Sequence, residues 1–277
     1  MRLKNQIQRN MLSREMEGIY IICVTYRLKV QELRSRSVFA ELIQYYDNIH
    51  VIISDNACDP DNRNAAQRFG YDYIDNGCNA GLSRAYNNAI KSIRDDKYWV
   101  MLSDDDTWFS REYMEAVERF VEGCGEYRLA AGIIKKTDGS VFSPQKKLLW
   151  KNRQSNMIHE TGAYDNIVCL NTGLLIHSSV LTRVGLFDED LFLDMIDYYL
   201  MDRLQRLGLC RVMVLPGEIK QDFSADRGTW RDQLQRYRTF RNDYIQFCQK
   251  TGKTWCYMIL GLIKRKLNIY RQAIWRK

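Results

Sequence analysis

Three consecutive aspartates, Asp104, Asp105 and Asp106, are the residues of this chain with the clearest capacity for chemistry. They follow residues 98–102 (YWVML), a short apolar run that predicts a buried strand. Carboxylates that alternate at a strand end can converge on one cation, and such hard oxygen ligands suit Mg²⁺ or Mn²⁺. The alternative is a solvated acidic turn, with Asp106 near the N-cap of a helix that begins at Thr107.

The chain around the triplet alternates apolar strands with helices, which predicts a mostly parallel sheet. Strands are expected at 18–24, 50–54, 71–74 and 98–102, and helices at 31–46, 61–69 and 82–93. Ligands of such sheets bind beyond the carboxyl ends of the strands. Polar clusters at 25–27, 55–56 and 104–106 fall at such ends, so we expect them to line one site.

The second half of the chain is less regular. Short strands and loops are expected from about 127 to 177, followed by helices at 178–184 and 195–207, a strand at 211–215, and helices at 229–249 and 253–275. The chain therefore predicts an α/β catalytic domain at 15–225 and C-terminal helices at 226–277.

Positive charge is concentrated at the two ends of the chain. The net charge is +7, yet residues 1–14 and 251–277 carry eleven basic residues and no acid, which leaves −4 on residues 15–250. A duplex-binding domain would carry basic charge on its body, so this distribution argues against nucleic-acid binding.

The cysteines and apolar runs indicate a reduced, cytoplasmic protein. The eight cysteines form no CxxC pair and have no zinc-finger spacing, so we expect reduced, mostly buried thiols. No secretory signal is evident, because the first apolar run, 19–24, has six residues. The longest run, 255–263, has nine residues, short of the ~20 that a spanning helix needs.

A series of short motifs follows a fixed order along residues 18–250. They are V-T-Y at 24–26, D-N at 55–56, N-x-G-x-x-x-A-x-N at 79–87, D-D-D at 104–106, N-T-G at 171–173, G-L-F-D-E at 185–189, F-L-D-M-I-D at 192–197 and R-N at 241–242. This order resembles the family 2 glycosyltransferases of the GT-A fold, especially bacterial rhamnosyl- and galactofuranosyltransferase-like members. The resemblance implies a GT-A (Rossmann-like), mostly parallel sheet flanked by helices, with a C-terminal helical extension.

The resemblance also implies an activity. It is that of an inverting, metal-dependent hexosyltransferase that moves a sugar, rhamnose or galactofuranose, from a nucleoside-diphosphate donor to a glycan acceptor. The acceptor is expected to be lipid-linked and the product a surface polysaccharide. The alternative is a noncatalytic carbohydrate- or membrane-binding scaffold of the same fold, in which the carboxylates need not converge. A sugar nucleotidyltransferase is disfavoured, because residues 24–30 (VTYRLKV) contain no glycine for a phosphate loop.

The resemblance assigns roles on the donor side. Asp104 and Asp106 match the D-x-D that binds the metal and the donor diphosphate, and Asp105 lies between them. The residues implied in nucleotide binding are Asp55 with Thr25 beside it, and Asn79, Gly81 and Arg84 at a helix N-terminus that could face phosphate or ribose. Asp55 could instead form an Asx turn, and Arg84 could be a solvated helix residue. Trp108 could stack on a sugar or serve as a core or lid aromatic.

Asp197 matches the general base of inverting members. Such a base typically contributes ~10²–10⁴-fold. Asp194, three residues earlier, could share its face and contact substrate, or could be the N-cap of the helix. Many relatives have an acid two positions after the base, where this chain has Tyr199. Asp222 occupies a slot in which the family often has a metal-binding His, so it is a candidate third ligand or a surface acid.

The three histidines, His50, His159 and His177, are expected to be structural rather than catalytic. The last helix carries an apolar face made of Cys256, Ile259, Leu260, Ile263, Leu267, Tyr270 and Ile274. Trp255, Trp275 and the basic residues of 253–277 complete a pattern suited to an anionic membrane surface. We therefore expect a cytoplasmic enzyme on the inner face of the cell membrane. The alternative is packing of this helix on the catalytic domain or on a second subunit of a homo-oligomer.

Overall fold

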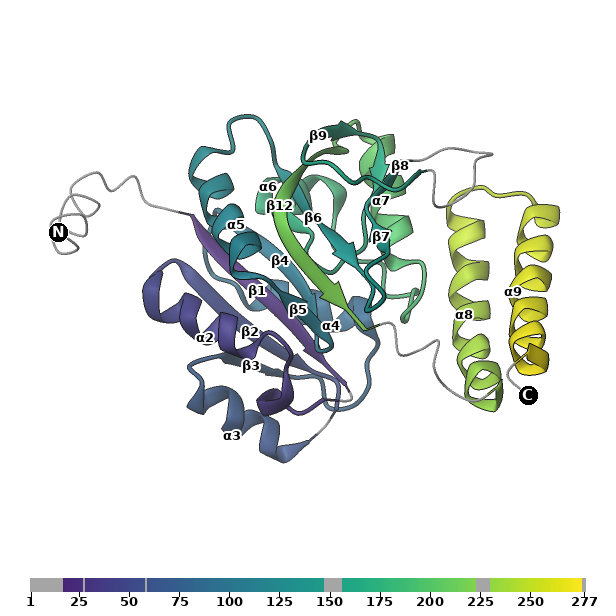
Figure 1. Ribbon diagram of the computed structural model, residues 1–277, viewed down its shortest axis with the longest axis horizontal. Coiled ribbons are helices and arrows are strands. Elements are labelled where there is room, and N and C mark those ends of the chain that lie inside the picture. The colour runs from purple at the N-terminus through teal and green to yellow at the C-terminus, as the bar shows by residue number, and fades with distance from the viewer. Residues whose placement is uncertain (1–16, 27, 58, 147–155, 223–229, 276–277) are drawn as a thin grey trace, which may run out of the picture.

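The computed structural model describes residues 17–26, 28–57, 59–146, 156–222 and 230–275. The basic segment 1–14, Arg27, Cys58 and the side chains of Ile274 and Trp275 lie outside the described residues. Figure 1 shows a twisted sheet with helices on both faces and a helical hairpin, α8 and α9, beside it.

The first part of the sheet is parallel, as predicted. The strands β1 (Gly18–Thr25), β2 (Ile49–Asp55), β3 (Asp72–Asp75) and β4 (Tyr98–Asp104) lie in the order β3-β2-β1-β4. They are connected by α2 (Arg36–Tyr45), α3 (Pro60–Arg68) and α4 (Leu82–Ser92). Thr25 pairs with Asp55, and Val24 pairs with Asp104. The polar strand ends therefore lie at one edge, which confirms their predicted placement.

The second part of the sheet is mixed. From β4 the order continues through β11 (Leu175–His177), β6 (Leu129–Lys135), β12 (Arg211–Gln221) and β5 (Thr107–Phe109). β6 and β12 are parallel to each other, whereas β11 and β5 are antiparallel to their neighbours. The short strands β7 (Val141–Ser143) and β9 (Gly162–Asp165) pair with β6 and β12, while β8 (Gln145–Lys146) and β10 (Ile167–Val168) form a separate pair.

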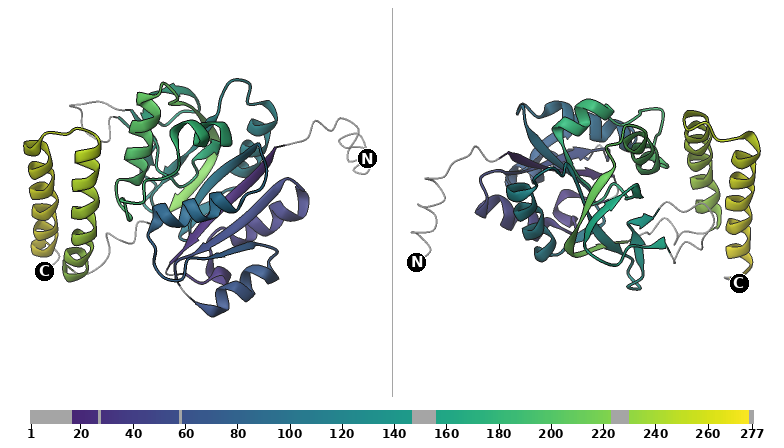
Figure 2. Two further views of the ribbon diagram at one scale, coloured as in Figure 1. Left: turned by 180° about the vertical axis from the view of Figure 1, so that it is seen from behind. Right: turned by 90° about the horizontal axis from the view of Figure 1, so that it is seen from above.

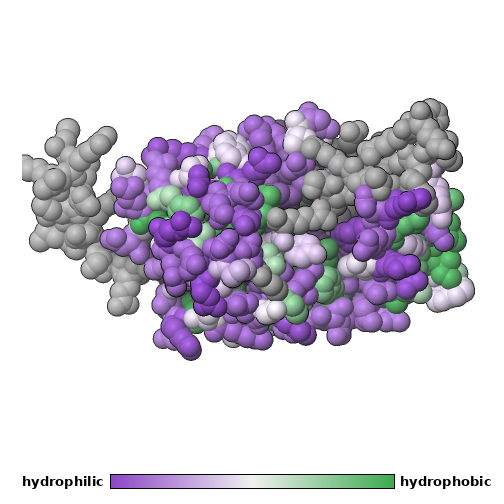
Figure 3. Space-filling view, turned by 90° about the horizontal axis from the view of Figure 1, so that it is seen from below, coloured by the Kyte–Doolittle hydropathy of each residue, from purple (hydrophilic) through white to green (hydrophobic). Residues whose placement is uncertain are grey.

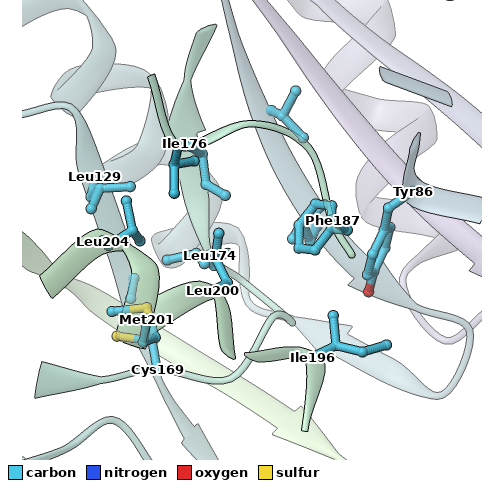
Figure 4. Packing of buried hydrophobic residues seen from close by; sticks show 14 of the residues in the cluster. Tyr86, Leu129, Cys169, Leu174, Ile176, Phe187, Ile196, Leu200, Met201 and Leu204 are labelled. Atoms are coloured by element: carbon cyan, nitrogen blue, oxygen red, sulfur yellow. The ribbon is translucent and has the colours of Figure 1, made fainter. Parts of the chain in front are cut away.

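Two buried clusters cover the two faces of the sheet. Figure 2 shows the helices that lie over these faces. One cluster joins the sheet to α2, α3 and α5 (Arg111–Gly123). The other joins it to α4, α6 (Ser178–Val184) and α7 (Ile196–Arg206), and α8 (Trp230–Lys250) adds Tyr244, Phe247 and Cys248. Figure 4 shows Ile196, Leu200 and Leu204 of α7 in this second cluster. α7 is therefore anchored by its apolar face.

The helix expected at 31–46 begins later than predicted. A short 3₁₀ helix, η1 (Val30–Glu32), comes first, and α2 starts at Arg36. Ser35, between them, is buried; its Oγ donates to the carbonyl of Thr107 at 2.7 Å and accepts from the N–H of Phe109 at 3.0 Å. This tertiary contact with β5 overrides the continuous helical pattern.

One helix was expected only in the alternative interpretation of the aspartate triplet, in which it would begin at Thr107. α5 follows β5, and its N-cap is Ser110, whose Oγ accepts from the N–H of Tyr113 at 3.2 Å. Asp106 is therefore not a helix N-cap. Apolar residues at 113, 114, 117, 120 and 121 give α5 a helical period that the sequence does contain.

The seven cysteines in the described part of the chain have free thiols, and four of them are buried. Over the same residues, no helix is both long and apolar enough to span a membrane.

β12 is longer than the strand expected at 211–215. Its register against β6 slips between Leu215 and Glu218, so Pro216 and Gly217 form a bulge. Gly217 has a φ of 102°, and a Cβ there would meet the backbone nitrogen of Tyr113. Beyond the bulge, β12 pairs with β5 and ends at Gln221, close to the aspartate triplet.

We expect Gly217→Ala to lower the melting temperature clearly more than Gly139→Ala. Both glycines have positive φ, which costs an L-residue about 1–2 kcal/mol, but a Cβ at Gly139 has nothing within 4 Å. The difference between the two variants in thermal unfolding isolates the clash with α5. Equal melting temperatures would contradict the proposed contact between the bulge and α5.

Candidate active site

Asp104 ends β4 as a half-buried carboxylate held by three neutral donors. Its Oδ2 accepts from Thr172 Oγ1 and from Gln221 Nε2, both at 2.7 Å, and its Oδ1 accepts from the Tyr86 hydroxyl at 3.2 Å. Burial raises the pKa of Asp104, although these hydrogen bonds counteract the effect. The three donors come from α4, the loop before β11 and the end of β12, so this carboxylate ties distant segments together.

Asp106 faces the same region as Asp104. The amide of Gln221 that bonds Asp104 also lies 3.4 Å from Asp106 Oδ1. Burial, and then the charges of Asp104, Asp105 and Asp222, raise the pKa of Asp106 to about 7. This edge of the sheet therefore holds more negative charge than its own donors neutralise, which is a condition that a bound cation relieves.

Asp105 is turned toward β1. Its Oδ2 accepts from the backbone N–H groups of Tyr26 at 3.0 Å and Leu28 at 3.3 Å. It thereby orders the chain that leaves β1.

The carboxylates at this edge of the sheet can supply part of the ligand shell of a divalent cation. Among the described residues, no three His, Cys, Asp or Glu side chains form a group that could hold a metal ion. Mg²⁺ in phosphate-transfer sites usually takes one or two carboxylates and completes its shell with phosphate and water. Asp106 fits that pattern, with Asp222 near enough to raise its pKa. Asp104 is engaged by three donors and is placed to support Asp106 and Asp222.

Asp197 lies in the first turn of α7, at a half-buried position. Its Oδ1 accepts from the N–H of Tyr198 at 2.9 Å. Burial, and then the charges of Asp194 and Asp104, raise the pKa of Asp197 to about 7. Burial raises the pKa of Tyr86 well above its usual value, and the charges of Asp104 and Asp197 raise it further, so the two carboxylates converge on one region.

Asp194 is not the N-cap of α7. Met195 occupies that position with a φ of 62°, and its side chain makes no cap bond. The carboxylate of Asp194 instead forms a two-point ion pair with Arg236 of α8, in which Oδ1 accepts from Nη2 at 2.8 Å and Oδ2 accepts from Nη1.

Asp55 is buried, and its carboxylate has four donors. Oδ1 accepts from Thr25 Oγ1 and from the N–H of Ala57, both at 2.8 Å. Oδ2 accepts from Asn62 Nδ2 at 3.1 Å and from the Tyr73 hydroxyl at 2.8 Å. The bond to Ala57 is the Asx turn that was the alternative role for Asp55. A nucleotide base would have to replace one of these four donors.

The segment before α4 is shaped by its contact with the loop at Phe192. Gly81 has a φ of 86°, and a Cβ there would meet the ring and the carbonyl of Phe192. Asn79 is exposed, and its Oδ1 accepts from the N–H of Gly81 at 3.3 Å. Arg84 is exposed and pairs with Glu189, Nε to Oε2, at 3.0 Å. Among the residues that the structure describes, Arg84 therefore pairs with a carboxylate of the protein itself.

The remaining predicted residues lie around the end of β12. Trp108 in β5 is partly exposed, and the ammonium of Lys220 lies 5.2 Å from its ring centroid. Asp222 follows Gln221. Gln221, the donor shared by Asp104 and Asp106, was not predicted as a site residue. The sequence pointed to it only through its position next to Asp222.

Two of the histidines, His50 and His177, are remote from this edge. His177 pairs in register with Trp99 and His50 with Tyr20, near the amino ends of β4 and β1. His177 is buried, with Nε2 3.0 Å from Glu17 Oε2.

Comparisons with solved structures agree with this fold. Mannosyltransferase PcManGT from Pyrobaculum calidifontis, in complex with GDP-Man and Mn²⁺, superposes with a TM-score of 0.57 at 12% identity, covering 97% of this chain and 80% of that one. TarS residues 1–349 from S. aureus give a TM-score of 0.56 at 13% identity, with coverages of 91% and 71%. These likenesses concern the fold alone, and they confirm the predicted GT-A architecture.

Sequence comparison gives the family. dTDP-rhamnosyl transferase RfbF of Shigella flexneri is 24% identical over 185 residues, which is 65% of this chain and 60% of the relative. Residues 22–191 match the model of glycosyl transferase family 2, a stretch that contains the aspartate triplet and ends just before Asp194. Because that match covers more than half of the chain, the chain belongs to glycosyl transferase family 2.

Proposed function

We propose that this protein is an inverting, metal-dependent glycosyltransferase that moves a hexose from a nucleoside diphosphate to a glycan acceptor. The observation that carries the proposal is the placement of Asp106 and Asp197 around Asp104. The amide of Gln221 lies within hydrogen-bond distance of both Asp104 and Asp106, and burial and then the charges of Asp194 and Asp104 raise the pKa of Asp197 to about 7. A noncatalytic scaffold has no need to retain such charge repulsion in a half-buried site, because each uncompensated carboxylate destabilises the fold.

The two carboxylates have separate tasks in this proposal. Asp106 and Asp222 would hold a divalent cation, which would supply Lewis-acid stabilisation of the charge on the departing diphosphate. Asp197 accepts the proton of the acceptor hydroxyl as that oxygen attacks the anomeric carbon, on the side opposite the leaving group. A pKa of about 7 makes Asp197 an effective base near neutral pH.

The nature of the donor rests on the relatives. The curated relative is named a dTDP-rhamnosyl transferase, and the solved structures include TarS with UDP and a mannosyltransferase with GDP-Man and Mn²⁺. We propose dTDP-rhamnose as the first candidate donor and UDP-galactofuranose as the second. The acceptor is a lipid-linked glycan on the route to a surface polysaccharide.

The donor hypothesis is tested by titrating a panel of nucleotide sugars with and without Mn²⁺. We expect at least one donor to bind, with an affinity that Mn²⁺ increases, and Asp106→Asn to lose that increase. Asp96→Asn, an exposed aspartate before β4, is the matched control and should behave as wild type. If no nucleotide sugar binds with or without metal, the scaffold alternative is favoured and the proposal fails.

We expect Asp197→Asn to keep donor binding and to lower kcat by at least about 10²-fold. The folded-state pKa of about 7 lies above the usual value of about 4, so the carboxylate destabilises the fold increasingly as pH rises from 4 to 7. The neutral amide removes this cost, so the melting temperature of the free protein should rise at pH 8 and change little at pH 4. Retained transfer would place the base elsewhere.

We further propose that α9 (Trp255–Trp275) lies on an anionic membrane surface. One side of α9 packs on α8 through Met258, Leu262 and the buried Ile269. On its outer side Leu260, Ile263, Leu267 and Tyr270 are 43–65% exposed, and Figure 3 shows hydrophobic atoms gathered at this end of the molecule.

The charges beside this stripe favour a lipid interface as its partner. At 100° per residue, Lys264 and Arg271 flank one side of the stripe and Lys266 flanks the other. An apolar stripe bordered by cations suits a helix that lies in the headgroup region of an anionic bilayer. A stripe that only packs on a second copy of the chain has no need of cations on both borders.

We expect Leu260→Ser with Leu267→Ser to reduce sedimentation with vesicles containing phosphatidylglycerol, and wild type to bind phosphatidylcholine vesicles weakly. Leu207→Ser, at an exposed leucine beyond α7, is the control for lost apolar surface. Unchanged vesicle binding would refute the membrane role. Conversion of a dimer to a monomer by the same double variant, without a change in vesicle binding, would assign the stripe to a second copy.

A further inference from the structure

Three consecutive backbone N–H groups point at one buried carboxylate from α8. Asp243, 2% exposed, accepts from Phe192 through Oδ1 at 3.0 Å. Its Oδ2 accepts from the N–H groups of Leu193 at 2.8 Å and Asp194 at 2.7 Å. Successive N–H groups that converge in this way form a nest for an anion, and hydrogen bonds to a carboxylate are stronger than neutral ones.

A second residue of α8 binds the side chain of the same loop. Arg236 lies seven residues before Asp243, two turns away on the same face of the helix. Its guanidinium pairs with both oxygens of Asp194. α8 therefore holds the loop in two ways, through the backbone N–H groups of residues 192–194 and through the side chain of Asp194.

The opposite side of the loop rests on the start of α4. The carbonyl of Phe192 accepts from the N–H of Leu82 at 2.7 Å, and the loop packs where Gly81 lacks a side chain. The chain then passes through Met195, with its positive φ, directly into Ile196 and Asp197. An unbranched L-residue adopts this conformation only where its surroundings fix it.

We infer that Asp243, assisted by Arg236, is a positioning residue that holds the loop 192–195 and thereby sets the place of the Asp197 carboxylate. The inference rests on the proposed function, in which Asp197 is the base. It makes the C-terminal helix α8 part of the apparatus for transfer, through the loop that precedes Asp197.

The test is Asp243→Asn in the full-length protein, with Asp232→Asn as the matched control, since Asp232 is exposed on the same helix. An asparagine has one acceptor oxygen, and its NH₂ would face N–H donors. We expect hydrogen exchange in residues 190–196 to accelerate at least about tenfold, because three hydrogen bonds are lost or weakened. We expect kcat to fall about 10- to 100-fold, with a smaller change in the donor KM, because the base is misplaced.

The pH–rate profile gives a readout that a merely structural role would not move. Water that enters a loosened loop should shift the acidic limb of the profile, set by Asp197, to lower pH. Arg236→Gln, at the half-buried part of the contact, should change hydrogen exchange, kcat and the pH–rate profile in the same direction but less strongly. This variant replaces Asp243→Asn if Asp243→Asn does not fold.

The possible outcomes separate this inference from the proposed function. Unchanged exchange in residues 190–196, or faster exchange with unchanged kcat and pH profile, would overturn the inference and leave the transferase proposal standing. A wild type that turns over no nucleotide sugar would overturn the proposed function and, with it, the catalytic part of the inference. The exchange experiment would still show whether Asp243 holds the loop.

Discussion

The site depends on several carboxylates that the fold holds close together at one edge of the sheet. Asp104 is half-buried there, and its carboxylate is stabilised by three neutral donors from α4, the loop before β11 and the end of β12. Each of these segments must reach the same point for the carboxylate to be tolerated. Beyond the bulge at Gly217, β12 ends at Gln221, whose amide lies within hydrogen-bond distance of both Asp104 and Asp106.

The position of α7 and of the loop before it places Asp197 beside these carboxylates. α7 is anchored by Ile196 and the apolar residues that follow it, whereas the loop before it is held by α8. The C-terminal hairpin is therefore joined to the catalytic part in two ways, through Tyr244, Phe247 and Cys248 in the core and through Asp243 and Arg236 at the loop. If α9 lies on a membrane as proposed, α8 is the element between that surface and the site.

The sequence predicted the edge of the sheet better than the contacts made there. Apolar strands ending in polar residues were enough to place Thr25, Asp55 and Asp104 side by side, because parallel strands in register share one carboxyl edge. Which way each side chain turns was not predictable, since it depends on distant donors. Asp105 turns to the backbone of Tyr26, and Asp194 pairs with a residue 42 positions away. Asp243 went unnoticed because a helical aspartate beside an R-N motif carries no local signal of three backbone donors.

We propose that the charge retained at Asp106 and Asp222 is matched by a cation and a diphosphate, while Asp197 faces the acceptor. A crystal structure with a nucleoside diphosphate and Mn²⁺, read at the manganese absorption edge, tests it directly. We expect one anomalous peak at about 2.1 Å from oxygens of Asp106 or Asp222 and of the diphosphate, with Asp197 outside the metal shell. A peak on Asp197, or a diphosphate bound away from the end of β4, would contradict it.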